Sequence, residues 1–178
     1  MDDALRQRLE SFVRPLYQDL DGVSRFDAVE RVASVARRLY AGPDDDKFEL
    51  LLLFQGLGKW LERMGNVSRT ALATGVAEEA LRETAASMAR LEEPVSEAER
   101  AVAAAILIDN GGARGLAERL ARSRREGQSV ADVVRAALAD VETPEWLGAA
   151  ARAMLEERRE RRRQVCKSIL DESFHFWW

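Results

Sequence analysis

Apolar residues recur at helical spacing along most of this 178-residue chain, and no segment alternates with period two. Between Ala4 and about Leu20, for example, one face of a helix would carry Leu5, Leu9 and Phe12. The chain is also rich in Ala, Leu, Glu and Arg, which favour helix, and poor in β-branched residues. We therefore predict an all-α fold.

Helix start signals divide the chain into about seven to eight helices, of which the last is long. These signals are Asp44–Asp46, Ser68 for a helix ending before Pro94, the capping box Ser96–Glu99, Ser129, and Thr143–Pro144. The helix after Asp44–Asp46 is apolar all round from Leu50 to Phe54, so it should be the central buried helix. We predict a single-domain helical bundle over residues 1–173, followed by an aromatic tail over residues 174–178.

Charge and cysteine content narrow the function classes. The net charge of -4 gives no general attraction to phosphate backbones, so nucleic-acid binding is not expected. Cys166 is the only cysteine, which excludes an internal disulfide and a cysteine-based zinc cluster, and we expect it to be a small buried residue. The acidic Met1-Asp2-Asp3 start does not resemble a signal peptide, and no run reaches the ~18 apolar residues of a membrane span. We expect a cytoplasmic protein.

The most informative motif is Leu51–Lys59, which reads Leu-Leu-Leu-Phe-Gln-Gly-Leu-Gly-Lys. It resembles the signature of the HD-superfamily metal-dependent phosphohydrolases. In that family a His-Asp pair stands between the apolar run and the Gly-Leu-Gly-Lys turn and holds the catalytic metal. Here the pair is Phe54-Gln55, so the surrounding motif is present without its metal ligands.

Three further segments resemble the same family in the same order. Phe26–Val32 is similar to its first ligand motif, with Ala28 where the family has a His. Ala105–Ala117 is similar to a later segment, with Ile106 in place of the ligating Asp, and Ala151–Arg158 resembles the terminal helix. The resemblance implies a helical bundle of the HD-domain type.

The resemblance also implies that the usual chemistry has been lost. A metal ion would polarise a phosphoryl oxygen and lower the pKa of bound water, and neither effect is available without ligands. The only histidine, His175, lies in the tail. We therefore predict a catalytically inactive binding or scaffold module with no cofactor, in which Phe54 and Ile106 pack where the metal would sit.

The alternative is a phosphohydrolase acting on a nucleotide or phosphate ester through a rebuilt, oxygen-ligated site for Mg²⁺ or Mn²⁺. Candidate ligand-binding residues are Asp27, Gln55, Lys59, Asp109 and Arg158, and a small phosphate-containing ligand would fit the two cationic ones. Further carboxylates on paper are those of Asp44, Asp45, Asp46 and Glu49. Helix capping and solvation explain the same carboxylates.

Two more clusters have a functional and a structural interpretation. Asp109 with Gly111, Gly112 and Gly115 could cradle an anion, but a helix end and close packing explain the same glycines, and we favour this second interpretation. The run Arg158–Arg163 could bind nucleic acid, but its interleaved acids favour a solvated, ion-paired helix face, and no aromatic residues are interleaved to stack bases.

The tail holds four large aromatic residues, Phe174, Phe176, Trp177 and Trp178. Exposed apolar clusters of this size mark interfaces. The tail either folds back on the bundle, with His175 as part of the aromatic cluster, or meets a protein partner or a second copy of the chain.

Overall fold

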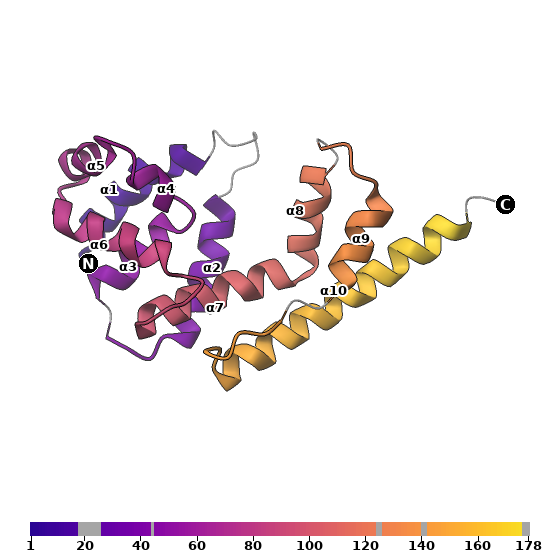
Figure 1. The fold of residues 1–178 in the computed structure, drawn as a ribbon. Helices are drawn as coiled ribbons and strands as arrows, with labels where there is room; N and C mark the ends of the chain where they lie inside the picture. The colour runs from indigo at the N-terminus through magenta and orange to yellow at the C-terminus, as the bar shows by residue number, and fades with distance from the viewer. Residues whose placement is uncertain (18–25, 44, 124–125, 140–141, 176–178) are drawn as a thin grey trace. The chain divides into compact units, whose positions relative to one another are not determined.

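A computed structural model describes residues 1–17, 26–43, 45–123, 126–139 and 142–175, with side chains described as far as residue 172. This part of the chain is all-helical and contains no strand, which confirms the predicted all-α class (Figure 1). Its helices are α1 Asp3–Val13, η1 Arg14–Tyr17 (a 3₁₀-helix), α2 Phe26–Leu39, α3 Asp46–Phe54, α4 Gly58–Leu61, α5 Asn66–Thr74, α6 Glu78–Ala89, α7 Glu97–Gly111, α8 Ala113–Ser123, α9 Val130–Leu138 and the long α10 Ala149–His175.

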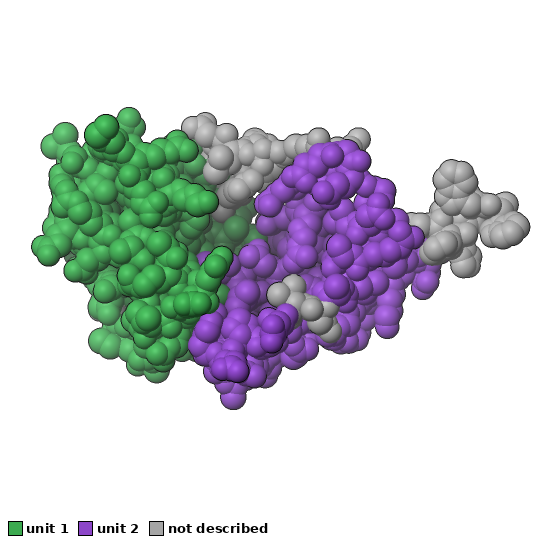
Figure 2. Space-filling view, viewed as in Figure 1, with its two compact units in different colours: residues 1–105 green, residues 106–178 purple. Residues whose placement is uncertain are grey.

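The chain forms two compact units, residues 1–105 and residues 106–178, drawn in green and purple in Figure 2. The boundary falls within α7. Each unit is described by itself below. A single domain over residues 1–173 stays a prediction, as does the HD type of the bundle.

Unit 1 is built around α3, which packs against α1, α2 and α6. Every residue from Phe48 to Phe54 is buried, including the acidic Glu49. The core around this helix consists of Leu9, Val13, Tyr17, Phe26, Val29, Leu50, Leu53, Phe54, Leu57, Leu61, Val76, Leu81 and Ala85. The prediction of a central buried helix is therefore confirmed for unit 1.

Unit 2 is built around α10, against which α8 and α9 pack. Its core contains Leu116, Val134, Ala137 and Cys166, all nearly or fully inaccessible to solvent. Burial raises the pKa of the Cys166 thiol, while the charges of Arg162 and Arg119 lower it. Cys166 is a small buried core residue, as predicted.

Most predicted helix starts are confirmed by the bonds that cap them. The Asp45 carboxylate accepts a hydrogen bond of 2.6 Å from the Phe48 amide at the start of α3. At α7 the Ser96 hydroxyl accepts from the Glu99 amide, and the Glu99 carboxylate accepts from the Ser96 amide, at 3.1 Å each. Ser129 caps α9 in the same way, through the Asp132 amide. These bonds are local, which is why the sequence indicates them.

Three predicted helix boundaries are wrong. The first α-helix ends at Val13 and continues as η1, because Pro15 lacks an N–H group and its ring clashes with the preceding turn. Ser68 does not start a helix that runs to Pro94; α5 ends at Thr74, the following Gly75 adopts a left-handed φ of 82°, and α6 comes next. The last helix begins at Ala149 instead of at Thr143–Pro144.

Among the described residues, no helix combines the length and the apolar character that a membrane crossing needs.

Candidate functional site

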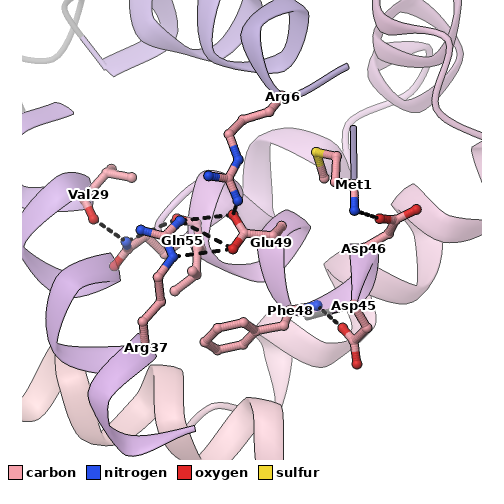
Figure 3. A network of polar contacts seen from close by, with 10 residues as sticks. Met1, Arg6, Val29, Arg37, Asp45, Asp46, Phe48, Glu49 and Gln55 are labelled. Atoms are coloured by element: carbon pink, nitrogen blue, oxygen red, sulfur yellow. Dashed lines mark hydrogen bonds and ion pairs between the residues drawn. The ribbon is translucent and has the colours of Figure 1, made fainter. Parts of the chain in front are cut away.

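The Phe54-Gln55 pair, where the resemblance expects the metal ligands His and Asp, lies at the end of α3 in the interior of unit 1. Phe54 is 0% exposed and belongs to the apolar core. Gln55 is also buried, and its Nε2 donates hydrogen bonds to the carbonyl oxygens of Val29 and Leu52 at 3.2 and 3.0 Å (Figure 3). One position is therefore used for packing and the other for satisfying backbone carbonyl groups.

Tyr17 holds the same end of α3 from η1. Its hydroxyl oxygen lies 2.8 Å from the Leu53 carbonyl oxygen and 2.6 Å from the Gln55 carbonyl oxygen. Burial raises the pKa of this hydroxyl far above its usual range, so the group stays protonated and able to donate. Tyr17 thereby serves carbonyl groups that the end of a helix leaves without intrahelical partners.

Ala28 and Asp27 lie in the first turn of α2. Ala28 is half-buried and Asp27 is exposed. The Val29 carbonyl that accepts from Gln55 belongs to the residue next to Ala28, so the structure brings these two expected ligand positions onto adjoining elements. Neither Ala28 nor Phe54 offers an atom that can coordinate a metal.

The Gly-Leu-Gly-Lys turn has a backbone explanation. Gly56 has a φ of +82°, in the left-handed region that a residue with a Cβ atom rarely adopts. A Cβ atom on Gly58 would lie 3.1 Å from the Cβ atom of Met88, so this glycine allows α4 to approach α6 closely. Lys59, the last residue of the motif, is exposed on α4.

Glu49 is the centre of a buried ionic network (Figure 3). Arg37 of α2 donates to it three times, from Nη2 at 2.9 Å and 3.2 Å and from Nε at 3.3 Å. Arg6 of α1 places its Nη2 atom 2.8 Å from the same carboxylate. The carboxylate thus joins three helices of unit 1 and is not available as a metal ligand.

Glu99 is a second buried carboxylate, and the groups that hydrogen-bond to it lie in unit 1. Its burial raises its pKa, but hydrogen bonds from the Ser96 and Val95 amides, from the Ser87 hydroxyl and from Arg90 outweigh this and lower the pKa to about 2. It serves as the reciprocal partner of the capping box. In the described part of the chain, no three His, Cys, Asp or Glu side chains gather so that they could hold a metal ion.

The expected ligand position Ile106 and the candidate Asp109 lie on α7 in unit 2, both half-buried. The other expected ligand positions and candidates, Ala28, Phe54, Asp27 and Gln55, belong to unit 1. The packing of Ile106 at a former metal site therefore stays a prediction.

Close packing explains the glycines that follow Asp109. A Cβ atom on Gly111 would lie 2.7 Å from Leu155, and one on Gly115 would lie 2.1 Å from the Asn110 carbonyl oxygen. A Cβ atom on Gly112 would lie 3.5 Å from Cδ of Arg158. Arg158 is exposed, so its aliphatic stem crosses Gly112 while its charged group reaches solvent. These contacts support the packing interpretation over an anion cradle.

The arginine run of α10 is mainly an ion-paired helix face, as the sequence favoured. Arg161 pairs with Glu157 at 2.5 Å and Arg163 with Glu160 at 3.1 Å. Two arginines of the run are buried, however. Arg159 donates to the Thr143 hydroxyl and to Glu156, and Arg162 is 2% exposed. Arg162 therefore lies in the interior of unit 2, whereas Arg158 is exposed.

The aromatic tail lies largely outside the described residues. Phe174 and His175 form the last turn of α10, but their side chains are not described, and Phe176, Trp177 and Trp178 are not described at all.

The sequence did not predict the residues that hold the Leu51–Lys59 motif in place, which are Arg6, Tyr17 and Arg37. It also did not predict that Glu49 is paired with the two arginines. One signal was available: a charged residue beside an all-apolar helix core must be paired if it is buried. The identity of the partners had no signal, because it depends on how α1 and α2 pack against α3.

Comparisons with protein-family models, with curated proteins and with solved structures found no match for this chain. The resemblance to HD-type phosphohydrolases therefore rests on the segments quoted above, and the fold that the structure supports is an all-helical one with a long C-terminal helix.

Proposed function

We propose that this protein is a degenerate HD-type domain that works as a binding or scaffold module and has no phosphohydrolase activity. The observation that carries the proposal is the burial of Phe54 and the hydrogen bonding of Gln55. The ring of Phe54 is fully buried, and both hydrogen bonds from the Gln55 amide nitrogen go to carbonyl groups of the same unit.

The chemical reason is that two of the three expected ligand positions in unit 1 have no atom that can coordinate a metal. Metal-assisted phosphoryl transfer needs several side-chain atoms directed at one ion, with a coordination position left for water or substrate. Ala28 and Phe54 have no such atom. No second function is favoured by a specific observation, since Asp27 and Lys59 are exposed and Glu49 is held by two arginines.

The proposal is tested by restoring the ligands within unit 1. We would make the triple variant A28H/F54H/Q55D and measure bound Mn²⁺ or Zn²⁺ by metal analysis after gel filtration and by calorimetry. Two imidazoles and a carboxylate are enough ligands for detectable binding. We expect the variant to bind one ion and the unaltered protein to bind none.

The matched control is F54H/Q55D, which keeps Ala28. If Ala28 occupies a ligand position, this control binds metal at least about tenfold more weakly than the triple variant, because loss of even an outer-shell partner of a ligand costs about that much. The substitutions weaken the core, so circular dichroism must first show that both variants are helical. Added metal should then raise the melting temperature of the triple variant more than that of the control, because an ion that binds only the folded state stabilises it according to its affinity.

Two results would count against the proposal. A folded triple variant that binds no metal would remove the HD-type assignment. Hydrolysis of nucleotides or a generic phosphate ester by the unaltered protein with Mg²⁺ or Mn²⁺, abolished by Asp27→Ala or Asp109→Ala, would establish the rebuilt-site alternative instead.

A further inference from the structure

A small surface pocket of about 200 Å³ lies in unit 2, where the end of α8, the residues that follow it and α9 come together. The two helices pack against each other (Figure 1). Val133 and Ala136 of α9 supply the apolar part of the lining, and Ser123 at the end of α8 is buried. The volume is below the roughly 300–1,000 Å³ of pockets that hold drug-sized ligands, so this pocket suits a small ligand.

Backbone hydrogen bonds hold the residues after α8 at the pocket. The Ser123 carbonyl oxygen accepts from the amides of Glu126 and Gln128, at 3.0 Å each. The Ser129 hydroxyl then caps α9 by accepting from the Asp132 amide at 3.1 Å. The backbone of Glu126 and Gln128, whose side chains line the pocket, is therefore fixed relative to α8 and α9.

Two exposed arginines of α8 line the pocket without an acidic partner. Among the described residues, Arg122 has no hydrogen-bond or ion-pair partner, and Arg119 has only the Asn110 carbonyl oxygen, at 3.5 Å. By contrast, Arg161 and Arg163 of α10 are both paired with glutamates of their own helix. The guanidinium groups of Arg119 and Arg122 are thus free to bind a ligand.

The charge around the pocket is positive although the chain as a whole is acidic. Residues 113–128 contain five arginines and two glutamates, a net charge of +3 in a chain of net charge -4. One of the glutamates, Glu126, lines the pocket but forms no ion pair with Arg119 or Arg122. The described lining therefore carries two positive charges and one negative charge, and its potential attracts anions.

The hydrogen-bonding groups of the lining narrow the class of anion. A guanidinium group has five N–H donors and no acceptor, and its planar fork matches the oxygens of phosphate and carboxylate groups. The side-chain amide of Gln128 adds donors, whereas the Ser123 hydroxyl already donates to the Leu120 carbonyl oxygen at 2.9 Å. Donors from three side chains suit an anion with oxygens on several sides, which a phosphate group has and a carboxylate lacks.

We propose that this pocket of unit 2 binds a phosphate group, held by Arg119, Arg122 and Gln128. The group is a free phosphate ion or the end of a small phosphate monoester. Lys59 and Arg158, the cationic residues that the sequence suggested for a phosphate-containing ligand, do not line the pocket. The site uses none of the expected metal-ligand positions, so the inference goes beyond the proposed function and does not depend on it.

The test is a titration of the full chain with inorganic phosphate, followed by the ¹⁵N–¹H chemical shifts of the backbone amides and of the arginine Nε–H groups. Ionic strength is held constant with chloride, so that general screening does not change during the titration. We expect the shifts to change at residues 119–136 and a dissociation constant on the order of 1 mM, because both arginines are exposed and exposed charge pairs contribute little. A parallel titration with glycerol phosphate distinguishes the two sources of the group: binding of both ligands shows a site for phosphate monoesters, and binding of inorganic phosphate alone shows an ion site.

Three variants test the assigned residues. Arg122→Gln should weaken phosphate binding about tenfold, as loss of a charge-assisted hydrogen bond does, and Arg119→Gln should act in the same direction. Glu126→Gln should strengthen binding about two- to threefold, because it removes a negative charge from the lining. The matched control is Arg114→Gln, an exposed arginine of the same helix that pairs with Glu118 and does not line the pocket.

The control should bind phosphate as the unaltered protein does. If Arg114→Gln weakens binding as much as Arg122→Gln, the anion is attracted by the general charge of α8 and the assigned site is wrong. Shifts that do not respond to phosphate well above the expected dissociation constant also overturn the inference. Arg122 has no partner among the described residues, so Arg122→Gln removes no contact of the fold, and a folded variant with unchanged affinity is equally decisive.

Discussion

Replacing Glu49 with Gln should cost unit 1 far more stability than its small chemical change suggests. Glu49→Gln keeps the shape of the side chain but removes its charge and turns one acceptor oxygen into an NH₂ donor. The carboxylate now accepts from Arg37 at 2.9–3.3 Å and from Arg6 at 2.8 Å, at a site that is 2% exposed. The variant therefore weakens the bonds to the oxygen that remains and removes those to the oxygen that becomes an NH₂ group, because a guanidinium group has no acceptor.

The magnitude follows from the bonds involved. A hydrogen bond to a charged group contributes about 1.5–3 kcal/mol and a neutral one about 1 kcal/mol, so loss of the charge costs about 1 kcal/mol for each arginine. Each oxygen of Glu49 accepts two bonds, so the one that becomes an NH₂ group adds about 1 kcal/mol for each of the two bonds lost outright. Arg6 and Arg37 are 35% and 45% exposed and can turn partly to water, which limits the total to about 2–3 kcal/mol.

The measurement is urea unfolding followed by far-ultraviolet circular dichroism. Glu30→Gln is the matched control, because Glu30 makes an exposed ion pair with Arg14 at 3.4 Å, with side chains 60% and 46% exposed. Pairs of this kind contribute no more than about 1 kcal/mol. If Glu49→Gln lowers the free energy of unfolding by no more than Glu30→Gln does, the argument that the buried network holds α1, α2 and α3 together is refuted.

Four further substitutions test the energetics of unit 1. Phe54→Ala should lower the free energy of unfolding by about 3–5 kcal/mol, because it leaves a cavity around a fully buried ring; a loss below 1 kcal/mol in urea unfolding would mean that the ring is not packed. Gly56→Ala should lower the free energy of unfolding by about 1–2 kcal/mol through its φ of +82° alone, since no atom lies within 4 Å of the added methyl group. For Gly58→Ala the loss depends on how far Met88 can move. Thermal melts of the two variants separate backbone strain from side-chain contact. The pKa of Glu99 is depressed from 4.5 to about 2 in the folded state, so the stability that Glu99 contributes, about 2–3 kcal/mol, is present above about pH 5 and is lost as the pH falls toward 2. Acid unfolding of Glu99→Gln should lack this pH-dependent loss. An acid-unfolding profile identical to that of the unaltered protein would contradict the assignment.

The features that the sequence predicted correctly are local ones. Asp45, Ser96 and Ser129 each cap a helix through an amide three residues ahead, so the interaction lies within a few residues of sequence. The central position of α3 was also predictable, because a helix with apolar residues on every side has no face that tolerates water.

The features that the sequence did not predict depend on contacts between distant segments. Arg6 precedes its partner Glu49 by 43 residues (49 − 6), and Arg37 precedes it by 12 residues (49 − 37). Many exposed carboxylates and arginines in a chain with 33% charged residues could have formed such pairs. Only the packing of α1 and α2 on α3 selects these, and local pattern carries no information on that packing.

Boundary errors arose where a local signal competed with another. Ser68 has a residue type that starts helices, yet Gly65 precedes α5 and Asn66 bonds the Trp60 carbonyl, so the helix begins earlier. Gly75 then ends it, since a left-handed φ of 82° terminates a helix more decisively than a well-formed apolar pattern extends one. Pro15 acts similarly at the end of α1.

The two kinds of residue in the Leu51–Lys59 motif respond to different physical demands. Gly56 and Gly58 are required by the backbone conformation. Gly56 allows a left-handed turn, and Gly58 allows α4 to approach α6 closely. Both requirements hold whether or not a metal is bound. Phe54 and Gln55 suit a buried site that holds no metal. An unpaired metal-ligand side chain buried there would lower the stability of the fold more than a ring that fills the space or an amide that donates to two carbonyl groups. A sequence can therefore retain the turn of a catalytic motif for structural reasons alone, and a resemblance carried by glycines and apolar residues is evidence about the fold, whereas evidence about the reaction must come from the residues that would touch the metal.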